Sequence, residues 1–142
     1  MIQERQFLNF IPPRLDGDVI EDKRRYMVVA KNNFNKTIDM INISKISGKN
    51  NRILLKDYNV IIDDYKPLSL PSFAKTNTIY RIEYFKELDN YISFGGKKLK
   101  QDEFANIIDK SKEYIEKHKG INIIKFTKEE FLSKNPLEVN NL

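Results

Sequence analysis

Two runs of β-forming residues decide the fold of this sequence: RYMVVA at residues 25–30 and IDMINIS at residues 38–44. β-branched and aromatic side chains favour extended structure, and both runs are short for a helix. The polar cluster NNFN at residues 32–35 lies between them, and asparagine is a common turn residue. The three segments together predict two strands that pair as a hairpin.

Further short strands are predicted on both sides of this hairpin. A turn at residues 15–18 leads into Val19-Ile20, and a polar turn at residues 47–51 precedes strands at residues 52–55 and 58–62. Pro67 and Pro71 exclude a central strand, so residues 66–72 are predicted to be a loop before a strand at residues 76–82. Many short strands with closely spaced turns predict a small, curled, antiparallel, barrel-like sheet.

One long helix is predicted at Gln101–Lys119, which makes the fold class α+β with a C-terminal amphipathic helix. Phe104, Ile107, Ile108 and Ile115 fall on one helical face, and Gly120 follows as a C-terminal cap. A short strand is predicted at residues 121–126. Thr127 and Glu130 then have the spacing of a capping box, which predicts a short helix to about Ser133.

Composition limits the class of protein. A chain of 142 residues with 40% apolar and 32% charged residues is expected to form one globular domain. No apolar run approaches the length of a membrane span, and the start MIQERQFLNF lacks the apolar stretch of a secretory signal. Without cysteine there is no disulfide, thiolate nucleophile or cysteine-based zinc site. We therefore expect a cytoplasmic protein with no membrane partner.

The positive charge is concentrated in one window. The net charge is +5, but residues 23–56 alone hold 9 Lys and Arg against the single acid Asp39, which gives +8. Such a window favours a polyanionic partner, because phosphate contacts release counterions and attract over long range. A solvated lysine-rich surface is the alternative, and a membrane surface is disfavoured because the window is not an amphipathic helix.

The absent motifs narrow the chemistry. The sequence has no glycine-rich phosphate loop, and its one histidine, His118, falls in the last turn of the predicted helix. The acidic pairs Asp63-Asp64 and Asp102-Glu103 are placed at a turn and at a helix start, so neither a metal site nor a cofactor is predicted. Cleavage of RNA requires neither, since its own 2′-hydroxyl can attack the adjacent phosphate. An arginine can then bind two phosphate oxygens with its forked guanidinium, and a hydroxyl can orient a phosphate oxygen. Both residue types occur beside the predicted strands, as Arg24-Arg25, Ser44 and Ser47.

The order of these segments resembles that of the MazF/PemK toxin endoribonucleases from about Leu15 to Lys119. Members of that family open with a Gly-Asp-hydrophobic strand, and after a loop an Arg-Pro pair heads a hydrophobic strand. An asparagine-rich turn follows, then a strand that ends in a polar loop with a hydroxyl residue. A serine-bearing segment, a glycine turn and an amphipathic helix complete the order. The matching residues are Gly17–Ile20, Arg25–Val29, Asn32–Asn35, Ile41–Gly48, Pro71–Lys75, Gly95-Gly96 and Glu103–Lys119.

The resemblance implies a barrel-like sheet of the MazF/PemK, SH3-like kind and a homodimer. It also implies metal-independent cleavage of single-stranded RNA to 2′,3′-cyclic phosphate and 5′-hydroxyl ends by the toxin of a toxin–antitoxin system. The antitoxin is a protein, or a small structured RNA as in the ToxN-like relatives. Residues 1–119 would form this domain with a lead-in at 1–14, and residues 120–142 an extension. The catalytic arginine corresponds to Arg25 and the threonine to Ser47. The expected RNA contacts are Lys23, Arg24, Lys31, Lys45, Lys49, Arg52, Ser72 and Lys75.

Three departures from the family pattern keep other functions open. Tyr26 replaces the proline after the arginine, Ser47 replaces the threonine, and the loop at residues 21–24 is short. One alternative is a non-catalytic RNA- or DNA-binding module of small-barrel fold, with Tyr26, Phe34 or Phe73 as a stacking platform. Another is an interaction protein of a phage or mobile element that keeps the fold without the activity.

Overall fold

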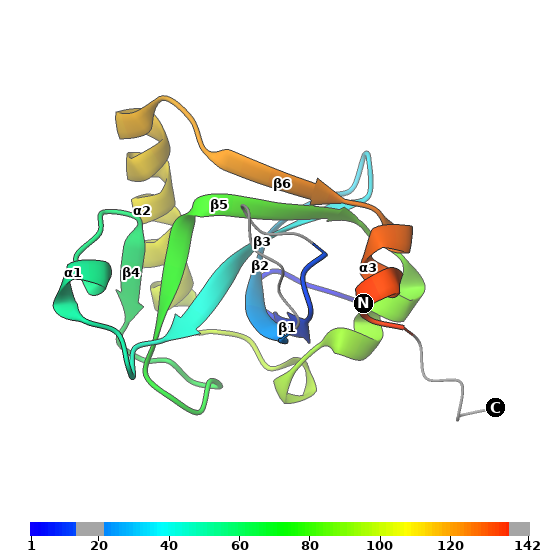
Figure 1. Cartoon of the computed structure of the whole chain (residues 1–142), viewed down its shortest axis with the longest axis horizontal. Coiled ribbons are helices and arrows are strands. Elements are labelled where there is room, and N and C mark those ends of the chain that lie inside the picture. The colour runs from blue at the N-terminus through cyan, green and yellow to red at the C-terminus, as the bar shows by residue number, and fades with distance from the viewer. Residues whose placement is uncertain (14–21, 137–142) are drawn as a thin grey trace.

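The computed structural model describes residues 1–13 and 22–136 and has a mixed α+β architecture (Figure 1). Within these residues the sheet has six strands in the order β1-β2-β3-β5-β4, and β6 lies beside β5. The strands are β1 Phe7–Phe10, β2 Arg24–Asn32, β3 Thr37–Lys45, β4 Asn59–Ile62, β5 Ser72–Glu83 and β6 Asn122–Phe126. The helices are α1 Asn51–Leu54, α2 Gln101–His118 and α3 Lys128–Lys134, with 3-10 turns η1 Lys86–Tyr91 and η2 Phe94–Gly96.

The hairpin predicted from the two β-rich runs is confirmed as β2 and β3. These strands pair antiparallel from Arg25 opposite Ile43 to Asn32 opposite Thr37. The register shifts between Val28 and Ala30, which is the mark of a β-bulge. The predicted strands at 58–62, 76–82 and 121–126 correspond to β4, β5 and β6. The predicted turn and strand at residues 15–20 lie outside the described residues.

The mixed class and the largely antiparallel sheet are confirmed, but the sheet is not closed into a barrel. β5 is twelve residues long and binds two strands along one edge. β4 pairs with residues 72–75 of β5, and β6 runs parallel to residues 78–82. β1 and β4 therefore stay at opposite ends of the described strand order and form no ladder with each other. The sheet branches at β5 instead of closing.

Residues 52–55 were predicted as a strand, and this prediction was wrong. Residues Asn51–Leu54 form the short helix α1. The reason is the residue before it: the side-chain oxygen of Asn50 accepts a hydrogen bond from the backbone N–H of Ile53 at 3.0 Å, which caps the helix. Asn59 then donates to the carbonyl of Ile53 at 2.6 Å and holds the turn that follows.

Two apolar cores lie on the two faces of the sheet. On one face α2 covers β4 and β5 with the buried side chains of Phe104 and Ile107, as the predicted stripe required, although Ile115 is partly exposed. On the other face α3 inserts the fully buried Phe131 among the rings of Phe10, Phe85, Tyr91 and Phe126. The predicted capping box of Thr127 and Glu130 is present at the start of α3.

The strand β1 was not predicted, although its side chains are central to both cores. Phe7 belongs to the core under α2, and Leu8 and Phe10 belong to the core under α3. β1 comes from the expected lead-in and β6 from the expected extension, and both are strands of the same sheet. No helix in the described part of the chain is long and apolar enough to cross a membrane.

Candidate nucleic-acid interface

Arg25 is held in an unusual position at the start of β2. Its guanidinium carbon lies 4.6 Å from the centroid of the Phe94 ring, so the planar group is stacked on an aromatic face. Its Nε is buried and has no hydrogen-bond partner among the described residues. Burial lowers the pKa of Arg25, but a guanidinium remains charged at neutral pH. The side chain is a permanent, partly desolvated cation with unused donor capacity.

A hollow of about 290 Å³ lies beside this guanidinium. Lys23 precedes β2, Lys45 ends β3 and Ser72 begins β5, and all three line the hollow with Arg25. Lys45 and Ser72 are direct partners in the β3–β5 ladder. The Ser72 hydroxyl donates to the carbonyl of Leu70 at 2.8 Å, which leaves its oxygen able to accept. Four of the sequence-predicted residues therefore meet at one place.

Phe94 was missed by the sequence prediction, although it positions Arg25. It has a φ of +59°, in the left-handed region that is costly for a residue with a side chain. The backbone N–H of Ser93 donates to the carbonyl of Phe7 at 2.8 Å, which fixes this turn to β1. The Phe94 ring also makes an edge contact with Phe7 at 5.8 Å. An aromatic residue directly before Gly95-Gly96 was the available sequence signal.

A second group of cations lies on the opposite face of the sheet at the same end. Successive side chains of a strand alternate between faces, so Arg24 faces away from Arg25. Lys75 belongs to this second face, with its Nζ 6.0 Å from the centroid of the buried Phe73 ring. Burial lowers the pKa of Lys75, and the positive charges of Lys49 and Arg24 lower it further. Like charges converge here, which is a property of polyanion sites.

Ser44 is the hydroxyl that lies on this second face. It is opposite Phe73 in the β3–β5 ladder and is partly buried. Its hydroxyl donates to the side-chain oxygen of Asn42 at 2.7 Å, and the Asn42 amide donates to the carbonyl of Arg25 at 3.2 Å. Ser44 was noted in the sequence beside Ser47 and belongs to the ordered sheet.

The other predicted residues lie elsewhere. Ser47 is exposed in the turn after β3 and does not line the Arg25 hollow. Arg52 is exposed on α1, and Lys31 lies near the far end of β2. The pairing of Arg25 with Ser47 at one phosphate stays a prediction.

The three aromatic candidates for base stacking differ completely in exposure. Tyr26 and Phe73 are fully buried, so neither ring is available to a base. The Tyr26 hydroxyl has no hydrogen-bond partner among the described residues, and burial raises the pKa of Tyr26. Phe34, by contrast, is 98% exposed at the tip of the β2–β3 hairpin.

The cations at this end of the sheet have no acidic partner among the described residues. No described carboxylate lies within 4.0 Å of Lys23, Arg24, Arg25, Lys45 or Lys75. Some cations in other regions are paired: Arg81 binds Asp39 at 2.7 Å, and Lys100 binds Asp64 at 3.1 Å. Uncompensated cations at one end of a sheet are suited to a bound anion.

The single histidine lies away from these cations. His118 Nε2 is 2.8 Å from the Oδ2 of Asp57, and its ring packs against that of Tyr114 at a tilt of 31°, with centroids 4.2 Å apart. The hydrogen bonds of His118 and Lys117 hold the pKa of Asp57 below its usual range. Within residues 1–13 and 22–136, no three His, Asp or Glu side chains gather closely enough to hold a metal ion.

The cations of both faces surround the ends of the same strands, so a single extended anion can reach several of them. The chemistry that such a site supports is recognition of phosphate oxygens by a stacked guanidinium, by ammonium groups and by hydroxyls. No protein-family model matches this chain, and no curated protein matches it.

Proposed function

We propose that this chain binds single-stranded RNA through the Arg25 hollow and cleaves it without a metal ion, as the toxin of a MazF/PemK-like toxin–antitoxin system. The observation that carries the proposal is the convergence of Lys23, Arg25 and Lys45 on one hollow with no described acidic partner. The RNA backbone carries one phosphate anion per nucleotide. A stacked guanidinium, ready to donate two parallel hydrogen bonds, suits a phosphodiester better than a point charge does.

The proposed reaction uses the RNA itself as the nucleophile. The 2′-hydroxyl attacks the adjacent phosphorus, the new O2′–P bond forms, and the P–O5′ bond breaks. The proton of the 2′-hydroxyl leaves to a base, and the departing 5′-oxygen gains a proton. The products are a 2′,3′-cyclic phosphate and a 5′-hydroxyl. The protein supplies positioning and charge stabilisation, which are large contributions when the groups are preorganised.

Each proposed residue has one role in this reaction. Arg25 binds two oxygens of the phosphorane, with Phe94 holding its plane. Ser47, in the turn after β3, supplies the hydroxyl that the family resemblance assigns to the phosphate. Lys23, Lys45 and Ser72 hold the scissile phosphate in the hollow, and Arg24, Lys49 and Lys75 bind neighbouring phosphates on the other face. The proposed partners are an antitoxin, either a protein or a small structured RNA, and a second copy of the chain. The proposed location is the cytoplasm.

A non-catalytic RNA-binding module is the second candidate function. One observation favours it: Ser47 does not line the hollow that contains Arg25. A site with Arg25, Lys23 and Lys45 binds phosphate even when no second group is in place to promote the reaction. The two candidates differ in cleavage, not in binding.

Single-turnover cleavage of a long single-stranded RNA in EDTA tests the proposal. Arg25→Lys keeps the charge but removes the fork, so it should reduce cleavage far more than binding. Arg52→Lys is the matched control, because Arg52 is exposed on α1 and does not line the hollow. Ser47→Ala should reduce the rate by about 10²–10³, the factor typical of one lost oxyanion donor. Binding without cleavage by the unmodified protein would support the second candidate, and no binding would exclude both.

A further inference from the structure

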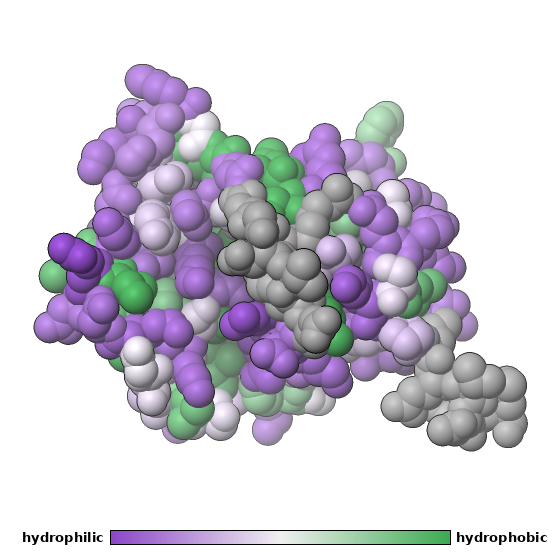
Figure 2. All heavy atoms as spheres, in the orientation of Figure 1, coloured by the Kyte–Doolittle hydropathy of each residue, from purple (hydrophilic) through white to green (hydrophobic). Residues whose placement is uncertain are grey.

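The tip of the β2–β3 hairpin is an ordered turn that carries an exposed aromatic ring. The side-chain oxygen of Asn32 accepts from the backbone N–H groups of Phe34 at 2.9 Å and Asn35 at 3.3 Å. The side-chain oxygen of Asn35 accepts from the Thr37 hydroxyl at 2.7 Å. These bonds order the turn, yet Phe34 itself is 98% exposed. Figure 1 shows the hairpin projecting from the body of the molecule, and Figure 2 shows a hydrophobic projection at that place.

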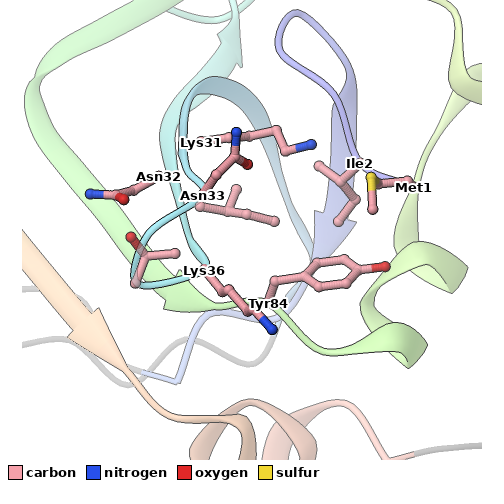
Figure 3. A pocket seen from close by; sticks show the side chains of 9 residues that line it. Met1, Ile2, Lys31, Asn32, Asn33, Lys36 and Tyr84 are labelled. Carbon is pink, nitrogen blue, oxygen red and sulfur yellow. The ribbon is translucent and has the colours of Figure 1, made fainter.

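A hollow of about 270 Å³ lies beside this turn. Figure 3 shows Ile2 and Tyr84 around it, with Lys31 from β2 and Lys36 from the turn on its sides. Lys31 and Lys36 have no ion-pair partner among the described residues. Phe34 is therefore close in sequence to two cations without an ion-pair partner, and no acidic residue occurs between residues 31 and 38.

The cations continue from the hairpin along two further hollows. A polar hollow of about 440 Å³ shares Lys31 with the first and adds Arg5 and Lys98. The next hollow, of about 890 Å³, shares Arg5 and Lys98 and adds Lys66 and Lys97. We name the six cations Arg5, Lys31, Lys36, Lys66, Lys97 and Lys98, with Phe34 at one end, the basic track.

Acidic residues compensate little of this charge. Glu4 is the one carboxylate of the middle hollow, and Asp64 is the one carboxylate of the last. Asp64 already binds Lys100 at 3.1 Å, and the hydrogen bond from Lys100 lowers the pKa of Asp64. The net charge of residues 57–142 is zero, so a charge count over that half of the sequence does not reveal the basic run KKLK at residues 97–100.

We infer that the basic track binds a segment of single-stranded RNA outside the Arg25 hollow, with a base stacked on Phe34 and phosphates on the cations. Sequence-tolerant single-strand binding combines these two elements, a basic groove along the backbone and exposed rings for the bases. A second copy of the chain fits less well, because two tracks of the same charge repel each other. The inference rests on the proposed function for the identity of the ligand as RNA.

The Phe34 end of the track is far from the Arg25 hollow, although the other end, at Lys66 and Gly96, is close in sequence to Leu68 of that hollow and to Phe94. β2 has nine residues and rises about 3.3 Å per residue, so its two ends lie roughly 25 Å apart. Substitutions this far apart are expected to act additively. Phe34→Ala should therefore weaken RNA binding by the same factor in the unmodified protein and in Arg25→Ala.

The test measures binding of a fluorescent 20-nucleotide oligouridylate that carries 2′-O-methyl groups and is not cleaved by the proposed reaction. Phe34→Ala should weaken affinity about fivefold or more, whereas Phe34→Tyr retains the ring and the affinity. Leu55→Ala is the matched control, since Leu55 is another exposed apolar side chain, at 82%. The double variant Lys97→Gln with Lys98→Gln should lower the slope of log affinity against log salt by about 1.4. The double variant Lys112→Gln with Lys125→Gln, at exposed positions outside the track, should leave the slope less changed.

Each outcome decides the inference. Unchanged affinity in Phe34→Ala would overturn it, and so would a change in sedimentation without a change in affinity, which would assign the ring to a protein contact. Normal cleavage of RNA with no Phe34 effect would overturn the track alone. Phe34-dependent binding without any cleavage would support the track and overturn the proposed nuclease. No binding of RNA by the unmodified protein would overturn both.

Discussion

Replacing Phe94 by leucine removes the ring beneath the Arg25 guanidinium and tests how that cation is prepared for phosphate. The guanidinium carbon is 4.6 Å from the ring centroid, and no described carboxylate holds it in place. Without the ring, Arg25 regains rotamer freedom and must be ordered when RNA binds. Ordering one such side chain costs about 0.5–1.5 kcal/mol, so Phe94→Leu should weaken RNA affinity by about 2- to 13-fold.

Removal of Arg25 itself should have a larger effect. A hydrogen bond to a charged group contributes about 1.5–3 kcal/mol, which corresponds to about 13- to 160-fold in affinity for Arg25→Ala. Because Phe94 acts through Arg25, Phe94→Leu should then cause no further loss in the Arg25→Ala background. The coupling energy of the double-mutant cycle should therefore equal the effect of Phe94→Leu alone.

Fluorescence anisotropy with the 2′-O-methylated oligouridylate measures all four proteins, and thermal melting confirms that each is folded. Phe85→Leu is the matched control, because Lys128 lies 5.4 Å from the Phe85 ring, which follows the C-terminal end of β5, whereas Ser72 of the hollow begins that strand. Its RNA affinity should be unchanged. An equal loss from Phe94→Leu with and without Arg25 would refute the positioning role of the ring.

Phe131→Ala should lower the free energy of unfolding by about 3–5 kcal/mol in urea denaturation, because the fully buried ring contacts four other rings. A loss below about 1 kcal/mol would show that α3 is only loosely attached. His118→Ala should leave single-turnover cleavage unchanged in EDTA, since His118 binds Asp57 and lies outside the hollow; a large loss would place the histidine in the reaction. Asp57 has a lowered pKa in the folded chain, so its stabilising contribution is present above the unfolded value of about 4 and is lost as pH falls through the folded value. Asp57→Asn should therefore melt at a lower temperature than the unmodified protein at pH 7 and at a similar temperature at pH 2; an equal difference at both pH values would contradict the linkage.

Local patterns were sufficient for much of the fold. The run RYMVVA and its partner IDMINIS specify the β2–β3 hairpin through β-forming side chains and an asparagine turn. The stripe of Phe104 and Ile107 specifies which face of α2 is buried. Two elements were not predictable in this way. α1 depends on a side-chain cap by Asn50. β1 has only four residues and is stabilised by contacts with residues distant in the sequence.

The candidate site was less predictable because it depends on which face of the sheet each side chain occupies and on contacts between residues far apart in the sequence. Charge counts identify Arg24 and Arg25 together, whereas alternation along β2 sends them to opposite faces. The ring that positions Arg25 comes from Phe94, 69 positions further along the chain, and no local pattern connects the two. The sequence also does not show which aromatic side chains are exposed. Of the three candidates Tyr26, Phe34 and Phe73, only Phe34 reaches the surface.

The cations at the end of the sheet reduce the stability of the folded chain when no anion is bound. Lys75 is partly desolvated and has Lys49 and Arg24 as its charged neighbours, and both effects disfavour its charged form. The fold tolerates this because the aromatic core around Phe10 and Phe131 is fully buried, and Phe10 lies directly opposite Arg24 in the β1–β2 ladder. An anion that binds only the folded state would relieve the repulsion and raise stability by mass action. Such an arrangement, in which local repulsion is offset by the packing of a buried core, is typical of binding sites.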